Sequence, residues 1–151
     1  MTAAKTLATL AFFLAALSFT AIQTRAEDAP ALTIIPGETA DLKEFLWTKR
    51  PIVVFADSAA DPRFIEQVRL LQAGVAALLL RDVVVLTDSD PAALGPLRLA
   101  LRPRGFALVL IDKDGQVKHR KPAPLSIREL SRSIDALPTR QQEIRDGLGK
   151  E

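Results

Sequence analysis

The sequence predicts an α/β domain with a mixed central sheet that carries helices on both faces. Short apolar, β-branched runs alternate with amphipathic stretches along residues 32–111, a pattern typical of parallel strands joined by helical crossovers. The strand-like run at 52–55 is apolar at consecutive positions, as expected when both faces of a strand are covered. Asp114-Gly115 then predicts a tight hairpin turn, which must add an antiparallel strand. With 151 residues, 48% of them hydrophobic, the chain suits one such domain.

The predicted elements follow the order strand, helix, strand, helix, strand, helix, strand, strand, helix (βαβαβαββα). They cover residues 32–35, 42–46, 52–55, 64–78, 83–86, 91–102, 106–111, 116–118 and 127–137. This order matches the thioredoxin fold.

Local signals mark where the first three helices begin and end. Thr39 is the expected N-cap of the first. Gly74 is a point at which the second helix could divide. Asp90-Pro91 opens the third, which Gly95-Pro96 must kink or restart and which ends before Pro103.

The last helix begins with the capping box Ser126-Ile127-Arg128-Glu129 and is closed by Pro138. The domain is therefore expected to occupy residues 27–138. Residues 139–151 form a polar tail that is expected to fray at its end.

Residues 1–26 are expected to be a secretory signal peptide. Lys5 supplies the positive charge, residues 7–22 are apolar, and Thr24-Arg25-Ala26 provides small residues for cleavage. The alternative is a retained membrane anchor, but a run of 16 residues with polar interruptions is short of the roughly 20 that span a bilayer. We therefore expect a chain that begins at Glu27, is periplasmic or secreted, and has no transmembrane anchor.

Charge is divided unevenly along the expected mature chain. Residues 27–97 carry 6 basic and 11 acidic groups, whereas residues 98–151 carry 12 basic and 7 acidic groups. The opposite charges of the two halves cancel, and interleaved aromatic residues are lacking, so no nucleic-acid partner is expected.

Residue types that are missing exclude much chemistry. The chain has no Cys and no Tyr, and His119 is its only His. Thiolate nucleophiles, Cys-ligated metals and His-rich metal sites are therefore excluded, and neither a cofactor nor a metal is expected.

Five segments, residues 50–56, 61–64, 81–86, 102–106 and 113–130, resemble the bacterial branch of the DUDES domains, a domain of unknown function. The resemblance covers essentially the whole mature chain. It implies a thioredoxin-like or peroxiredoxin-like fold, as found in exported bacterial proteins and animal extracellular matrix proteins, and it implies no established activity.

Two hallmarks of thioredoxins are replaced in this sequence. Ala60-Asp61-Pro62-Arg63 stands where thioredoxins have Cys-Gly-Pro-Cys, and Gly105-Phe106 takes the place of their cis-proline. Disulfide exchange requires a thiolate, so this chain alone cannot act as a thiol–disulfide oxidoreductase or peroxidase.

The loops next to these positions suggest an anion-binding pocket. In this fold the free N–H groups and the positive dipole end of the long helix meet at the loop that carries Ser58, Asp61 and Arg63. Arg102 and Arg104 belong to the neighbouring loop. Guanidinium groups that converge there would bind a phosphate, sulfate or carboxylate.

A structural interpretation of the same residues stays open. Ser58 and Asp61 have the spacing of a capping box. Arg63 or Arg104 could pair with Asp57 or Asp61 in a salt bridge that only stabilises the loop.

The tetrapeptide Lys118-His119-Arg120-Lys121 lies on the expected edge strand, where charges commonly prevent association of sheets. The competing interpretation is contact with an acidic partner or with anionic lipid headgroups. His119 has no recognisable serine and carboxylate around it, so it is not expected to be a general base. Trp47 is expected to pack its short helix onto the sheet.

These observations predict a non-catalytic binding module for a small anion or an extracytoplasmic protein. The alternative is a divergent peroxiredoxin-like enzyme that does hydrolytic or acid–base work on an anionic substrate. A raised carboxylate pKa inside a cleft would favour the enzyme. The enzyme would use Ser58, Asp57, Asp61, Arg63, Arg102 and Arg104.

Overall fold

The computed structural model describes residues 31–148. The predicted signal segment, residues 1–26, lies outside these residues. Within the described part, no helix is long and apolar enough to cross a membrane.

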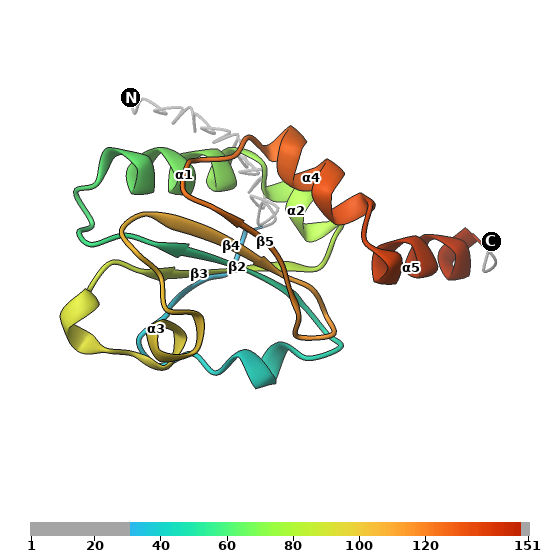
Figure 1. The fold of residues 1–151 in the computed structure, drawn as a ribbon. Coiled ribbons are helices and arrows are strands. Elements are labelled where there is room, and N and C mark those ends of the chain that lie inside the picture. Colours follow the sequence, from blue (N-terminus) through green and yellow to red (C-terminus); the bar gives the residue numbers. More distant parts are fainter. Residues whose placement is uncertain (1–30, 149–151) are drawn as a thin grey trace, which may run out of the picture.

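A mixed sheet of five strands forms the centre of the molecule, in the spatial order β1-β3-β2-β4-β5 (Figure 1). The first three strands are parallel, while β4 is antiparallel to β2 and β5 is antiparallel to β4. The strands are β1 (Ile34–Pro36), β2 (Arg50–Phe55), β3 (Val83–Asp88), β4 (Ala107–Ile111) and β5 (Val117–Lys121). The predicted fold class, including the antiparallel hairpin at one edge, is confirmed.

Helices cover both faces of this sheet, as Figure 1 shows. One face carries α1 (Pro62–Ala73), α2 (Val75–Leu79) and α4 (Ile127–Asp135), and the other carries α3 (Pro96–Leu101) and the short 3-10 helices η1 (Leu42–Phe45) and η2 (Pro91–Ala93).

The apolar run of β2 explains why two cores are needed. Ile52 and Val54 belong to the core under α1, α2 and α4, whereas Val53 and Phe55 belong to the core over α3 and η1. All four side chains are fully buried. Alternate residues of a strand point to opposite faces, so this continuous apolar run can be buried only when both faces are covered.

Most predicted helix boundaries are confirmed. The long helix divides at Gly74, where Ile127 of α4 packs directly against the space that a side chain would occupy. The capping box at Ser126 forms with both of its hydrogen bonds. Asp90 caps η2, and Pro96 begins α3.

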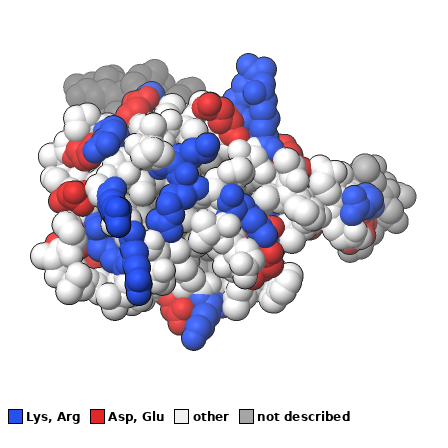
Figure 2. Space-filling view, viewed as in Figure 1, with Lys and Arg blue, Asp and Glu red and all other residues white. Residues whose placement is uncertain are grey.

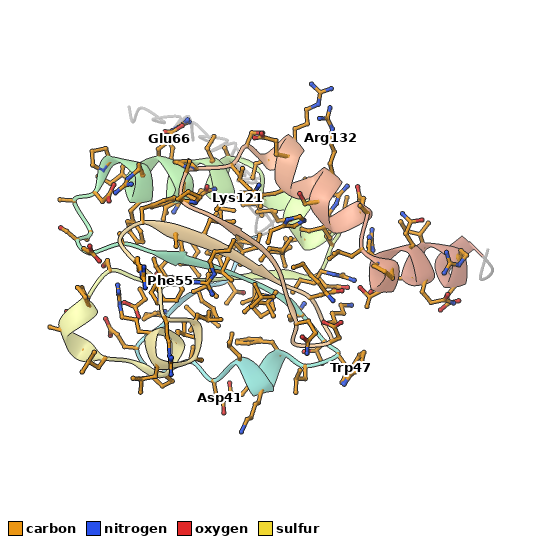
Figure 3. All side chains as sticks on the ribbon, in the orientation of Figure 1. Asp41, Trp47, Phe55, Glu66, Lys121 and Arg132 are labelled. Carbon is orange, nitrogen blue, oxygen red and sulfur yellow. The ribbon has the colours of Figure 1, made fainter. Side chains whose placement is uncertain are left out.

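Two predictions around the first helix are wrong. Its N-cap is Asp41 instead of Thr39, because the Asp41 carboxylate accepts the N–H of Lys43 at 2.9 Å and a single 3-10 turn follows. Trp47 does not pack on the sheet. Its φ of 60° and the bond from its N–H to the carbonyl of Lys113 (2.8 Å) end the turn and direct the side chain outward, where it is 71% exposed (Figure 3).

The predicted polar tail contains a helix that the sequence signals did not indicate, while its end, where fraying is expected, lies outside the described residues. Pro138 does not only end the last predicted helix: it begins α5 (Pro138–Leu148). Proline suits a first helical turn because its missing N–H would have no partner there. The side chains of Thr139 and Glu143 bind the buried Arg50, which ties α5 to the start of β2.

Candidate functional site

The loop after β2 ends at the N-terminus of α1, where Asp61 is the N-cap. The Asp61 carboxylate accepts the backbone N–H of Arg63 at 2.8 Å. It also accepts two hydrogen bonds from the Arg63 guanidinium, at 3.1 and 2.8 Å. Asp61 therefore occupies the helix N-terminus with a negative charge of its own, and Arg63 already has a carboxylate partner. The salt bridge of the structural interpretation is present.

The electrostatics of this loop do not favour acid–base catalysis. The hydrogen bond from Arg63 lowers the pKa of Asp61, so this carboxyl is held ionised instead of being poised as a proton donor. The Ser58 hydroxyl accepts the N–H of Ala60 at 3.1 Å. The predicted Ser58–Asp61 capping box does not form, since the N–H of Asp61 donates to the backbone carbonyl of Ser58. The hollow here is shallow and includes the carboxylates of both Asp57 and Asp61.

The loop between α3 and β4 presents Arg102 and Arg104 to solvent. Arg102 caps α3 in the left-handed region, with φ of 46°, and donates its N–H to the carbonyl of Arg98. Gly105, with φ of 59°, then turns the chain into β4. Glycine adopts a positive φ without steric cost, so it is well suited to this position.

A buried ion pair anchors the helix before this loop to the sheet. Arg98 donates from Nε to Asp88 Oδ1 at 2.8 Å and from its guanidinium to the carbonyl of Ala56. Its guanidinium also lies over the ring of Phe55, 5.5 Å from the centroid. Arg98 thereby joins α3 to the ends of β2 and β3. The sequence gives no signal for this pair, because a helical arginine looks the same whether it faces solvent or a buried carboxylate.

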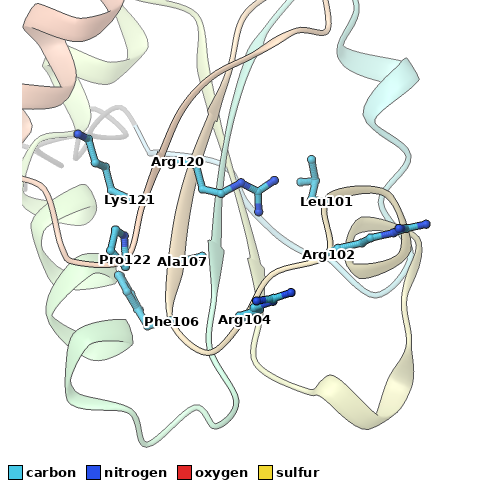
Figure 4. Close-up of a pocket in the computed structure, with 8 residues that line it drawn as sticks. All are labelled: Leu101, Arg102, Arg104, Phe106, Ala107, Arg120, Lys121 and Pro122. Carbon is cyan, nitrogen blue, oxygen red and sulfur yellow. The ribbon is translucent and has the colours of Figure 1, made fainter.

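A pocket of about 390 Å³ opens between this loop and the end of β5 (Figure 4). We call it the basic pocket. It contains four cationic side chains, no carboxylate, and an apolar lining. The residues are Leu101, Arg102, Arg104, Phe106, Ala107, Arg120, Lys121 and Pro122.

The side chains of Arg104 and Arg120 extend to the same side of the β4–β5 edge and face Leu101 across the gap, while Lys121 extends to the opposite side (Figure 4). Within residues 31–148, the four cations of the basic pocket take part in no ion pair. By contrast, Arg63, Arg69 and Arg98 each have a carboxylate partner. The basic pocket is therefore a place where positive charge is left without compensation.

The structure divides the predicted anion site between two neighbouring hollows. Arg102 and Arg104 both line the basic pocket, whereas Ser58 and Asp61 line the shallow hollow. Arg63 lies at the boundary: its guanidinium sits 5.3 Å from the ring centroid of Phe106, which lines the basic pocket.

Sequence analysis did not place Arg120 and Lys121 in this site. The signal was available in the basic tetrapeptide of the edge strand. Only the register, with Val109 opposite Arg120 and Leu108 opposite Lys121, shows that these residues reach the start of β4. Within the part of the chain that the structure describes, no cluster of His, Asp and Glu could hold a metal ion.

The sheet order, the antiparallel β4 and the long helix after β2 define a thioredoxin-like fold, and solved structures agree. A reduced 2-Cys peroxiredoxin from Plasmodium vivax is 16% identical over 68% of this chain and 85% of its own, with a TM-score of 0.56. An uncharacterised thioredoxin-like protein from Clostridium perfringens is 11% identical over 79% and 91%, with a TM-score of 0.55. Chloroplastic thioredoxin z is 22% identical over 72% and 98%, with a TM-score of 0.51. At these identities the likeness shows the fold alone.

The chain belongs to the DUF4174 family, a domain of unknown function, whose profile matches residues 41–143. No curated protein matches this chain. The matched range extends through β5 and α4 into α5, so it includes the basic pocket and the contact between Glu143 and Arg50.

Proposed function

We propose that this chain is an exported, non-catalytic binding module that takes an anionic group in the basic pocket. The observation that carries the proposal is an apolar hollow lined by the arginines Arg102, Arg104 and Arg120, which have no carboxylate partner in the described part of the chain. Arginine favours phosphate and carboxylate because its planar fork donates two parallel hydrogen bonds. A small anion and an extracytoplasmic protein that carries a phosphate or carboxylate would both supply such an anionic group.

Two features of the sequence support the non-catalytic and exported character. The chain has no Cys, so it cannot supply the thiolate that its structural neighbours' chemistry would need. The apolar N-terminal segment with its small-residue cleavage motif supports export. The resemblance to bacterial DUDES-type domains, which occur in exported proteins, supports it as well.

The proposal is tested by titrating isotope-labelled protein with phosphate, sulfate and acetate while amide chemical shifts are followed at two salt concentrations. We expect saturable shifts of the amides of residue 102, residues 104–107 and residues 120–121, with binding that weakens at higher salt. Shifts that scatter over the surface and never saturate would reduce the effect to general screening and contradict the proposal.

A matched pair of variants separates the pocket from net charge. Arg104→Ala removes a cation that lines the basic pocket, whereas Arg128→Ala removes an exposed cation of α4 that does not. We expect anion affinity to fall roughly tenfold in the first variant, as for the loss of one charge-assisted contact, and to stay unchanged in the second. Equal effects in both variants would show that only overall charge matters.

A further inference from the structure

Strand β5 is an open edge of the sheet. Among the described strands it pairs only with β4, so one side of its backbone has N–H and C=O groups without a strand partner. Its residues are exposed or half-buried throughout. Such an edge can accept a further strand from another chain.

Cationic side chains lie on both faces beside this edge. Arg120 pairs with Val109, which faces the α3 side, and it lines the basic pocket with Arg104. His119 and Lys121 pair with Leu110 and Leu108, which face the α4 side.

On the α4 side, Lys121 lines a hollow together with Arg132 and Glu129 of α4. Figure 2 shows Lys and Arg side chains over the centre of this view, with Asp and Glu mostly toward its borders. An added strand would therefore meet the uncompensated arginines of the basic pocket on its α3 side, and Lys121 and Arg132 beside the Glu129 carboxylate on its α4 side.

Of the cations on β5, Lys118 is already neutralised by Asp114 at 2.8 Å. Arg120 and Lys121 form no ion pair within residues 31–148. These charges oppose pairing with a second copy of the same strand, because like charges would lie across from one another. They attract a strand whose side chains are acidic.

We infer that β5 binds an extended acidic segment of a partner protein, which adds to the sheet as a sixth strand and places carboxylates in the basic pocket. This inference rests on the proposed function and names its ligand class. Backbone hydrogen bonds to β5 supply affinity, and the carboxylates opposite Arg104 and Arg120 supply specificity. About six residues of strand are enough to span the edge.

The test uses an acetylated and amidated six-residue peptide of alternating glutamate and threonine. We expect it to protect outward-facing amides of β5 from hydrogen exchange and to shift resonances of residues 117–122. Two control peptides carry a backbone N-methyl group at every second residue. One carries these groups at the odd-numbered residues and the other at the even-numbered residues. They keep the charge but cannot donate all hydrogen bonds to the edge. We expect the control peptide whose N-methyl groups face β5 to bind at least about tenfold more weakly than the parent peptide.

Charge is tested by Arg120→Glu, with Arg128→Glu on α4 as the matched control. The first variant is expected to lose at least about tenfold in peptide affinity and the second to bind as the natural protein does. If the N-methylated peptides bind as tightly as the parent, strand addition is overturned while anion binding stands. If phosphate and acetate bind but the peptide does not protect β5, the inference fails alone.

Failure of the peptide and the inorganic anions together overturns the proposed function as well. A dimer that forms through β5 in the absence of peptide would also overturn the inference, because the edge would then be occupied by a second copy.

Discussion

Replacing Arg50 should destabilise the protein more than any exposed substitution. Arg50 is fully buried at the start of β2, and each of its five N–H donors has an acceptor. Nε donates to Asp112 at 2.9 Å, and the two terminal nitrogens reach Thr139, Glu143 and the carbonyl of Arg81. Arg50→Met keeps an unbranched apolar stem in place of the arginine's aliphatic part and removes the guanidinium with all five bonds.

The loss in free energy of unfolding depends on the hydrogen bonds that Asp112 and Glu143 keep without Arg50. Asp112 is also fully buried, and without Arg50 it keeps only hydrogen bonds from the N–H of Lys113 and the hydroxyl of Thr139. Removing one partner of a buried ion pair costs about 3–5 kcal/mol. Glu143 is 28% exposed and still has Lys113 and Arg140, so we expect the lower end, about 3 kcal/mol. This is a large fraction of the 5–15 kcal/mol typical of a domain.

Denaturant unfolding followed by far-UV circular dichroism measures this loss. Arg69→Met is the control, because the exposed Arg69–Glu66 pair should leave the free energy of unfolding unchanged within error. The double variant Arg50→Met/Asp112→Leu removes both buried charges and should regain at least about 1 kcal/mol over Arg50→Met. A loss below about 1 kcal/mol in Arg50→Met, or a double variant less stable than the single one, would refute the reasoning.

Three further predictions concern acid stability, packing and export. Burial tends to raise the pKa of Glu143, but hydrogen bonds from Arg50, Lys113 and Arg140 outweigh it and lower the pKa from 4.5 to about 2. The ionised Glu143 therefore contributes its full stabilisation above about pH 4.5 and loses it as the pH falls toward 2. In Glu143→Gln the free energy of unfolding should change less over that pH range than in the natural protein. The same pH dependence in both proteins would contradict this prediction. Gly74→Ala should cost about 1–3 kcal/mol because the new Cβ would overlap Ile127, whereas Gly147→Ala, which points into open space in α5, should gain up to about 1 kcal/mol; thermal unfolding of both variants compares them, and similar shifts would be evidence against the packing argument. Mass spectrometry of protein recovered from outside the cytoplasm should give a chain that begins at Glu27, and an intact N-terminus at Met1 would rule out cleavage.

The fold could be predicted from the sequence wherever a local signal and the tertiary structure require the same residues. The run at 52–55 is apolar on both faces because both faces are buried, and Ser126 with Glu129 forms its capping box within four residues. Helix α5 lacked such a signal. Its residues are mostly polar, and it is held by a contact between Glu143 and Arg50, 93 positions apart in the chain. Local patterns carry no information about partners at that distance.

The candidate site could be predicted only in part, for a related reason. Arg102 and Arg104 follow from their place before the strand that enters the hairpin. Arg63 belongs to the same predicted cluster, but its partner is Asp61, two residues away. The choice between an intramolecular carboxylate and a free pocket depends on distances of a few ångströms, which spacing along the sequence does not fix.

The absence of cysteine also bears on where this chain can bind a ligand. A thiolate at the start of the long helix would benefit from the free N–H groups and the positive end of the helix dipole. In this chain Asp61 accepts the N–H of Arg63 and so takes that position with its own carboxylate. An external anion would meet the charges of Asp57 and Asp61 there. The uncompensated cations lie instead at the start of β4 and the end of β5, beside an open sheet edge. Variants at Arg104 and Arg120 should therefore weaken anion binding by about tenfold or more, while variants at Ser58 leave it intact.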